Sequence, residues 1–269
     1  MLLNKTKTAI RVLREKGLGS VVNLLKHNLG LSKHIDESSV IHDYFKSLGF
    51  TGTLIDVGAH LGYGLKPFAS DGWKVFAFEP DPDNREQLKK LASNFSSVNL
   101  DTRALSDVPA KQVSFYKSNE SDGVSGLQAF LPSHKSQYLV DVTTLADVIA
   151  EKSITAIDFL KIDTEGFDLL VLKGMNWEKI QPRLILCEFE DSKTLPLGYS
   201  YHDMANYLVE QGYKVIVSEW KPIKRYGEKH AWRGFYTYPH QLKVDRAWGN
   251  LIACRDDEDF QALSTFLKV

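Results

Sequence analysis

Three carboxylates stand where buried strands are expected to end. Asp56 lies just before a glycine-bearing turn, Glu79 follows the apolar residues 75–78, and Asp163 follows the strand expected at residues 157–162. In open α/β sheets, ligands bind outside the carboxyl ends of the strands, at the point where the strand order reverses. The three acids therefore predict one shared binding site. Each has a structural alternative, because Asp56 could cap its turn, Glu79 could be a solvated loop acid and Asp163 could cap the next helix.

The glycines of the first turn indicate which ligand the site would take. A dinucleotide fingerprint reads G-x-G-x-x-G, and its second glycine lets the backbone approach a pyrophosphate. Here Gly58 is followed by His60 two residues later, and the next glycines are Gly62 and Gly64. That spacing is wrong for a pyrophosphate but suits a loop curled under a smaller, phosphate-free ligand such as S-adenosylmethionine (SAM). Glu79 would then accept hydrogen bonds from both ribose hydroxyls.

The elements that must position these residues alternate between strands and helices. The sequence predicts seven strands, at residues 53–57, 74–78, 98–104, 157–162, 183–189, 214–218 and 250–254. Their near-continuous Val, Ile and Leu content predicts an α/β, Rossmann-like fold with a mostly parallel sheet covered by helices on both faces. Pro82 and Thr144 are expected to begin helices. Residues 112–116 favour an extra antiparallel strand, and residues 118–126 form a polar loop long enough to suggest a functional role.

Composition and charge exclude several classes of protein. The chain has 269 residues, a formal net charge of −1 and 43% hydrophobic residues, as is typical of a soluble globular protein. Near-neutral charge argues against nucleic-acid binding. Cys187 and Cys254 both lie in apolar runs, which predicts reduced core thiols rather than a disulfide or a metal site. Because no secretory signal opens the chain and no run approaches the roughly 18 apolar residues of a membrane span, we expect a cytoplasmic protein.

The N-terminal segment differs from the rest in charge. In residues 1–33 the only acid is Glu15, and the other charged residues are Lys or Arg. Apolar residues recur there at roughly helical spacing, so residues 1–48 are predicted to form a helical arm that precedes the main domain, residues 49–269. The arm could pack on the main domain or on a second subunit. Alternatively it could lie on an anionic membrane surface, which would make the protein peripheral to the inner membrane face, or it could be a flexible leader.

Four segments together resemble a known family. They are L-I-D-V-G-A-H-L-G at residues 54–62, A-F-E-P at 77–80, V-T-T-L at 142–145 and L-K-I-D-T-E-G-F at 160–167. This set resembles the FkbM family of SAM-dependent, class I Rossmann-like methyltransferases over about residues 50–190. The most specific element is residues 161–166 following the V-T-T-L segment, since the glycine loop alone would indicate only some class I methyltransferase. His60 stands where Asn is common in the family, and either residue can hydrogen-bond within the loop.

The resemblance implies O-methylation, with SAM as the cofactor and a hydroxyl as the acceptor. Asp163 or Glu165 is the expected base, with His230 and His134 as weaker candidates. A divalent-metal site at Asp163 and Glu165 is the competing reading, but no third ligand is evident, so no metal is expected. The residues expected to contact the cofactor are Asp56, Gly58, His60, Gly62, Glu79, Pro80, Ala104 and Asp163.

An aromatic and basic segment, residues 218–250, is the candidate acceptor-binding insertion. Aromatic faces beside polar donors suit the carbon face and hydroxyls of a sugar, although the segment could instead be an edge hairpin packed on the sheet. The expected contacts are Trp220, Arg225, Tyr226, Trp232 and Arg233. By analogy with family members of this type, we expect a sugar hydroxyl of a surface glycan or glycolipid. The alternatives are a small, polyketide-like acceptor, or a non-catalytic SAM-fold module that acts through the N-terminal arm in a glycan-assembly complex.

Overall fold

The computed structural model describes residues 35–118, 123–224, 226 and 230–269. The chain divides into two compact units, Met1–Phe50 and Thr51–Val269. In the first unit, helix α2 (Glu37–Ser47) begins at Asp36, whose side chain accepts hydrogen bonds from the backbone amides of the first turn. The basic residues 1–33 lie outside the described part, and with them the predicted membrane or subunit contact. No helix in the described part is both long and apolar enough to cross a membrane.

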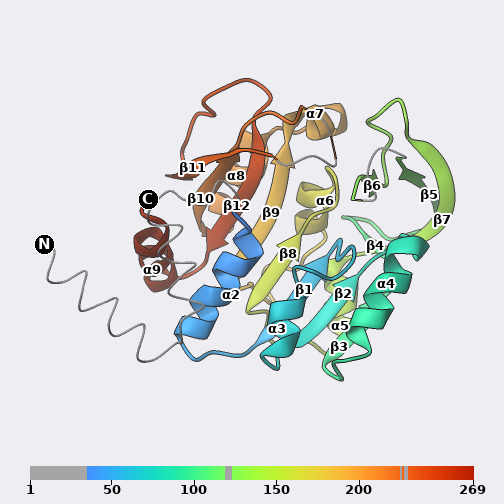
Figure 1. Cartoon of the computed structure of the whole chain (residues 1–269), viewed down its shortest axis with the longest axis horizontal. Helices are drawn as coiled ribbons and strands as arrows, with labels where there is room; N and C mark the ends of the chain where they lie inside the picture. The colour runs from blue at the N-terminus through green and yellow to red at the C-terminus, as the bar shows by residue number, and fades with distance from the viewer. Residues whose placement is uncertain (1–34, 119–122, 225, 227–229) are drawn as a thin grey trace, which may run out of the picture. The chain divides into compact units, whose positions relative to one another are not determined.

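The second unit is built on one large sheet with the strand order β11-β10-β12-β9-β8-β1-β2-β3 (Figure 1). Strands β3, β2, β1, β8 and β9 pair in parallel, while β12 is antiparallel to both of its neighbours. The predicted α/β, Rossmann-like fold is therefore confirmed. The strands are β1 (Thr53–Val57), β2 (Lys74–Phe78), β3 (Val98–Asp101), β8 (Phe159–Ile162), β9 (Leu184–Glu190), β10 (Lys214–Trp220), β11 (Trp232–Thr237) and β12 (Trp248–Cys254).

The sheet has one more strand than the sequence predicted. The additional strand is β11, which pairs antiparallel with β10 and forms the edge. Its residues belong to the segment that was predicted to bind the acceptor, and they join the sheet because the chain folds back on β10 as a hairpin. Cys187 and Cys254 lie in β9 and β12 as buried free thiols, as predicted.

Helices cover both faces of this sheet. Ile55 and Leu160 face a core cluster that also contains residues of α5, α6 and α8, whereas Phe159 faces the other way and contacts Phe68 of α3. Because successive strand residues point to opposite faces, covering both faces requires the continuous apolar strands seen in the sequence. The helices of this unit are α3 (Lys66–Ser70), α4 (Pro82–Ala92), α5 (Leu145–Glu151), α6 (Asp168–Lys173), α7 (Asp191–Thr194), η1 (Leu195–Leu197), α8 (Tyr201–Glu210) and α9 (Asp257–Leu267). Pro82 begins α4 and the Thr144 side chain caps α5, as predicted.

A second, smaller sheet has the order β4-β7-β5-β6 and is drawn beside the main sheet in Figure 1. It contains β4 (Ala104–Leu105), β5 (Ala110–Lys117), β6 (Ser125–Gly126) and β7 (Lys135–Thr143), and Ala104 and Phe115 lie in its own small core. Ala104 was predicted to end the third strand of the main sheet, which was wrong. That strand ends at Asp101, whose side chain accepts the amide of Arg103 and turns the chain toward the second sheet.

Candidate active site

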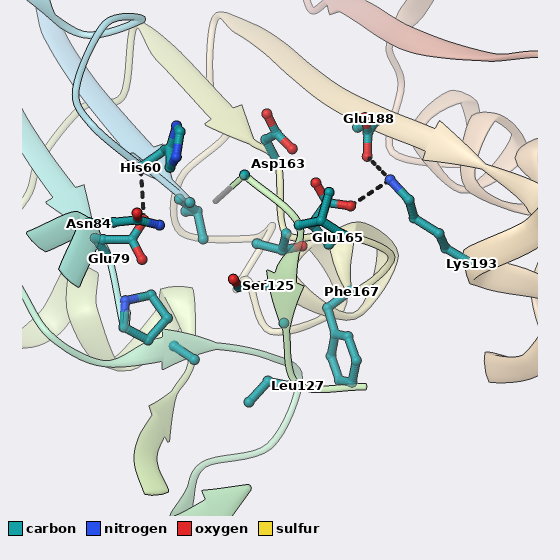
Figure 2. A pocket seen from close by; sticks show the side chains of 18 of the residues that line it. His60, Glu79, Asn84, Ser125, Leu127, Asp163, Glu165, Phe167, Glu188 and Lys193 are labelled. Carbon is teal, nitrogen blue, oxygen red and sulfur yellow. Dashed lines mark hydrogen bonds and ion pairs between the residues drawn. The ribbon is translucent and has the colours of Figure 1, made fainter. Parts of the chain in front are cut away.

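A cavity of about 340 Å³ lies where β1, β2, β8 and β9 end, against the second sheet (Figure 2). The chain runs from β1 outward to β3 and then returns to place β8 on the other side of β1, so the strand order reverses between β1 and β8. The cavity therefore occupies the position that ligands take in open α/β sheets. Of the predicted site residues, those lining it are Gly58, His60, Glu79, Pro80, Ala104, Asp163, Glu165, Tyr226 and His230.

Glu79 is the buried acid at one end of the cavity. Its side chain follows β2, is 5% exposed, and accepts the backbone amide of His60 at 2.7 Å and that of Asp81 at 2.8 Å. Burial raises the pKa of Glu79 to about 7, because the charged form has lost its water. Each oxygen of a carboxylate has two lone pairs, so each can accept one more hydrogen bond from a ligand. Two adjacent hydroxyl groups would match this pair of acceptors.

The glycine turn brings the end of β1 against the end of β8. Gly58 has φ +79°, and a Cβ atom there would lie 1.9 Å from the carbonyl oxygen of Asp163. Gly62 has φ +83°, and a Cβ atom there would lie 2.7 Å from Leu88 of α4. Gly62 does not line the cavity. Gly62 therefore packs against α4 instead of making the predicted cofactor contact. Gly58 lines the cavity and also allows the close approach of the turn to β8.

Replacing Gly58 with alanine is expected to reduce the free energy of unfolding by about 3 kcal/mol or more, because the new Cβ would overlap the backbone of Asp163 and also require an unfavourable positive φ. Gly72→Ala is the matched control. Gly72 has φ +85° with no atom within 4 Å of the added Cβ, so its cost should be only about 1 kcal/mol. Urea denaturation of both variants measures the difference, and equal costs would contradict the close approach of the turn to β8.

Asp56 does not reach the cavity. It is 1% exposed and pairs with Lys161, whose Nζ lies 3.1 Å from Asp56 Oδ1 and 3.6 Å from Asp163 Oδ2. Burial raises the pKa of Asp56, an effect that the adjacent Lys161 opposes. The structure therefore corrects the expectation of a direct cofactor contact. Asp56 instead ties β1 to β8, where it stands opposite Lys161 in the parallel register.

A group of three acids lies at the other end of the cavity. Asp163, Glu165 and Glu188 each place one carboxylate oxygen within 4.8 Å of the others, a spacing that could hold a metal ion. The sequence showed only the first two, so the expectation that a third ligand is lacking was wrong. Glu188 comes from β9, whose end lies beside the end of β8 in the sheet. The number of carboxylates is therefore sufficient for a metal site.

Lys193 of α7 lies among these acids and is 2% exposed. Its Nζ is 2.6 Å from Glu165 Oε2, 3.1 Å from Glu188 Oε2 and 2.9 Å from Glu190 Oε2. Burial raises the pKa of Glu165 and that of Glu188 despite this ammonium group. Burial alone would lower the pKa of Lys193, but the three carboxylates outweigh it and hold that pKa well above its usual range. The group keeps its positive charge at neutral pH.

Sequence reasoning missed Lys193 and Glu188, and it did not predict that a second sheet would border the cavity. The signal available was the acids Glu188, Glu190 and Asp191, which lie at and just after the end of the strand predicted at residues 183–189. The second sheet had a partial signal, since the extra strand expected at residues 112–116 is part of β5 and the loop expected to be functional, residues 118–126, includes β6. Phe115, Ser125 and Gly126 of this sheet line the cavity, together with Leu127, which follows β6.

The aromatic segment contributes less to the cavity than predicted. Tyr226, His230 and also Trp248 line it. Trp220, Trp232 and Arg233 do not, because they pack on the hairpin: Trp220 is buried, Trp232 Nε1 donates to Ser218 Oγ, and Arg233 Nε lies 2.9 Å from Glu219 Oε1. For these three residues the alternative of an edge hairpin packed on the sheet is the one that the structure favours. Arg225 lies outside the described residues.

His134 is engaged in holding a loop. Its Nδ1 accepts the amides of Phe130 and Leu131 at 3.0 and 3.1 Å, and its Nε2 lies 3.2 Å from the carbonyl oxygen of Val124. With Nδ1 as acceptor, Nε2 carries the proton and donates to that carbonyl. Since His134 does not line the cavity either, it does not fit the role of a base.

Comparison with known proteins identifies a family that matches this chain. The model of the FkbM methyltransferase domain matches residues 56–215. A search of curated proteins found no match. Among solved structures, a putative caffeoyl-CoA O-methyltransferase from Staphylococcus aureus is 12% identical, with a TM-score of 0.43, over 94% of this chain and 99% of that one. A putative RNA methyltransferase from Pyrococcus horikoshii is 11% identical, with a TM-score of 0.44, over 81% and 82%. Likeness this remote says nothing about the acceptor.

Proposed function

The chain belongs to the FkbM methyltransferase family, and we propose that it transfers the methyl group of SAM to a hydroxyl oxygen of a sugar in a surface glycan or glycolipid. The observation that carries the proposal is the buried carboxylate of Glu79 at the wall of the cavity, beside the turn that holds Gly58 and His60. A cavity that held only water would not require a buried carboxylate in its wall. A ribose with two adjacent hydroxyls accounts for it.

The residues present fit such a cofactor. Glu79 would accept the ribose hydroxyls, and the His60 amide already fixes the orientation of its carboxylate. Apolar side chains from both sheets line the same cavity and would contact a flat base, among them Phe78, Leu105 and Phe115. When bound, SAM would supply a methyl group attached to a sulfonium sulfur. That sulfur is a good leaving group and needs no proton. The protein therefore has to align the acceptor oxygen and accept its proton.

In this proposal Glu165 or Asp163 accepts that proton. Both line the cavity, and burial raises the pKa of Glu165, which makes its carboxylate a stronger base than an exposed one. Lys193 remains protonated and cannot take this role. It holds Glu165 through the ion pair at 2.6 Å.

A sugar acceptor is supported by the residues around the acids. Tyr226 and Trp248 offer aromatic faces, and the carboxylates of Glu165 and Glu188 can accept hydrogen bonds from hydroxyl groups. The decisive experiment is transfer of labelled methyl from SAM into polysaccharides, lipid-linked glycans and small metabolites extracted from the source cells. Label in the glycan fractions supports the proposal, whereas label only in small metabolites favours the polyketide-like alternative. SAM binding without any transfer favours the non-catalytic module.

We further propose that the protein acts in the cytoplasm, with its basic N-terminal segment at the inner face of the membrane. Sedimentation of the full chain with vesicles of anionic lipid tests this location. Binding to anionic but not to neutral vesicles is the expected result, because the charged residues of segment 1–33 are almost all basic.

SAM affinity is expected to rise with pH across neutrality. Hydroxyl donors favour the charged form of Glu79, whose pKa in the free protein is about 7. If only the charged form binds, affinity should be about tenfold higher at pH 8 than at pH 6. Calorimetry at both pH values measures it, and buffers with different ionisation enthalpies should show proton release on binding. Glu79→Gln is the control, since it should remove this pH dependence; an unchanged dependence would mean that another group is responsible.

A further inference from the structure

The group of three acids at the end of the cavity, Asp163, Glu165 and Glu188, already has a cation beside it, the ammonium group of Lys193. We propose that Lys193 is the built-in cation of this cluster, a positioning residue whose ammonium holds Glu165 and Glu188 where other carboxylate clusters use a divalent metal ion. The inference concerns how the site is held together, so it does not depend on methyl transfer.

The surroundings of Lys193 are those of a fixed ion rather than a surface lysine. Three carboxylates, those of Glu165, Glu188 and Glu190, lie within 3.1 Å of its Nζ. Two aromatic rings complete the environment, with the Phe130 centroid 5.4 Å and the Tyr226 centroid 5.6 Å from the same atom. A long, flexible side chain is ordered here by contacts from several separate segments of the chain. Figure 2 shows Lys193 reaching from α7 toward Glu165 and Glu188.

The backbone of the acidic turn is shaped to receive this lysine. Glu165 has φ +56°, a left-handed conformation that is unfavourable for a residue with a side chain. Gly166 follows with φ +104°, and a Cβ atom there would lie 3.1 Å from Cβ of Lys193. The turn therefore lies directly on α7, and its unusual conformation directs the Glu165 carboxylate to the ammonium.

The ammonium and a divalent ion would compete for the same acids. Of the three carboxylates that are close enough to share an ion, two are already bound by Lys193 Nζ. A second cation bound to these two groups would lie within a few ångströms of the ammonium and would be repelled by it. Removing the lysine charge should therefore create a metal site that the natural protein does not offer.

Titration with Mn²⁺ tests the proposal, with the EPR signal of free Mn²⁺ as the readout. The wild-type chain should leave the signal unchanged up to about 1 mM Mn²⁺, whereas Lys193→Met should bind one ion at least about tenfold more tightly. Lys193→Arg should show no gain, because it keeps the charge. Adding Glu188→Gln to Lys193→Met should abolish the gain, which shows that the ion sits on these acids.

Two results would overturn the proposal. One is Mn²⁺ binding by the wild-type chain that is lost on Glu188→Gln, because the metal and the lysine would then coexist. The other is Lys193→Met that binds no more Mn²⁺ than the wild type. If Lys193→Met does not fold alone, Mn²⁺ should restore its circular dichroism spectrum, and failure to do so also counts against the proposal. SAM titration of the same wild-type sample reports on the proposed function separately, so either can fail without the other.

Discussion

Replacing Glu79 with alanine should weaken SAM binding by about 100-fold, as measured by calorimetry at pH 8. The variant loses two hydrogen bonds between a buried carboxylate and the ribose, together worth about 3 kcal/mol. It also removes the acceptor that holds the backbone amide of His60 at 2.7 Å, so the glycine turn loses one of its fixed points. Because Glu79 is 5% exposed, water does not easily take the place of its carboxylate at the His60 amide or at the ribose hydroxyls.

Glu86→Ala is the matched control for this experiment. Glu86 lies on α4, close in sequence to Glu79, but its side chain is 73% exposed and pairs only with Lys90 among the ion pairs described. An exposed pair of this kind contributes little, so SAM affinity should stay within about twofold of the wild type. Undiminished affinity in Glu79→Ala would show that the cofactor is held elsewhere. Equal losses in both variants would point to damage to α4 rather than to the ribose contact.

Glu165→Gln is expected to lower turnover by about 10²–10⁴-fold while SAM affinity changes little. The amide has the same shape but cannot take a proton from the acceptor hydroxyl, and general base catalysis contributes about this factor. Burial raises the pKa of Glu165, so the wild-type rate should increase as pH rises and the carboxyl ionises. The variant should lose that increase. Both quantities are measurable with labelled SAM in the extract fraction that accepts methyl.

Glu190→Gln separates a catalytic role from an effect on Lys193. Glu190 pairs with the same ammonium at 2.9 Å but does not line the cavity. Its substitution should therefore reduce turnover far less than that of Glu165. Similar losses in the two variants would mean that Glu165 acts only through the lysine. Asp163→Asn completes the set, and a larger loss there than in Glu165→Gln would make Asp163 the base.

Local sequence patterns were sufficient for the framework of the site. The largely apolar runs at residues 53–57, 75–78 and 157–162 identified β1, β2 and β8, because a strand buried on both faces is mostly apolar. Capping chemistry placed the starts of α4 and α5 at Pro82 and Thr144. These signals are local, since each depends on residues within a few positions of one another. They were enough to indicate the fold and the family.

Which side chains meet in the cavity was decided only by the tertiary structure. Glu188 and Lys193 reach the acids because β9 lies next to β8 and α7 follows directly, a proximity that depends on strand order. Asp56 is buried in an ion pair with Lys161, its parallel partner in β8, and does not line the cavity. Likewise, Trp220 and Arg233 became part of a hairpin rather than of the cavity.

The physical reason is that strand ends and caps are set by neighbours along the chain, whereas the choice of face depends on partners far away in sequence. A one-residue difference in register reverses which side chains face the ligand. The sequence alone thus determined a parallel sheet with acids at its ligand-binding edge. Only the packing of β8, β9 and α7 decided that Glu165, Glu188 and Glu190 surround Lys193 at that edge.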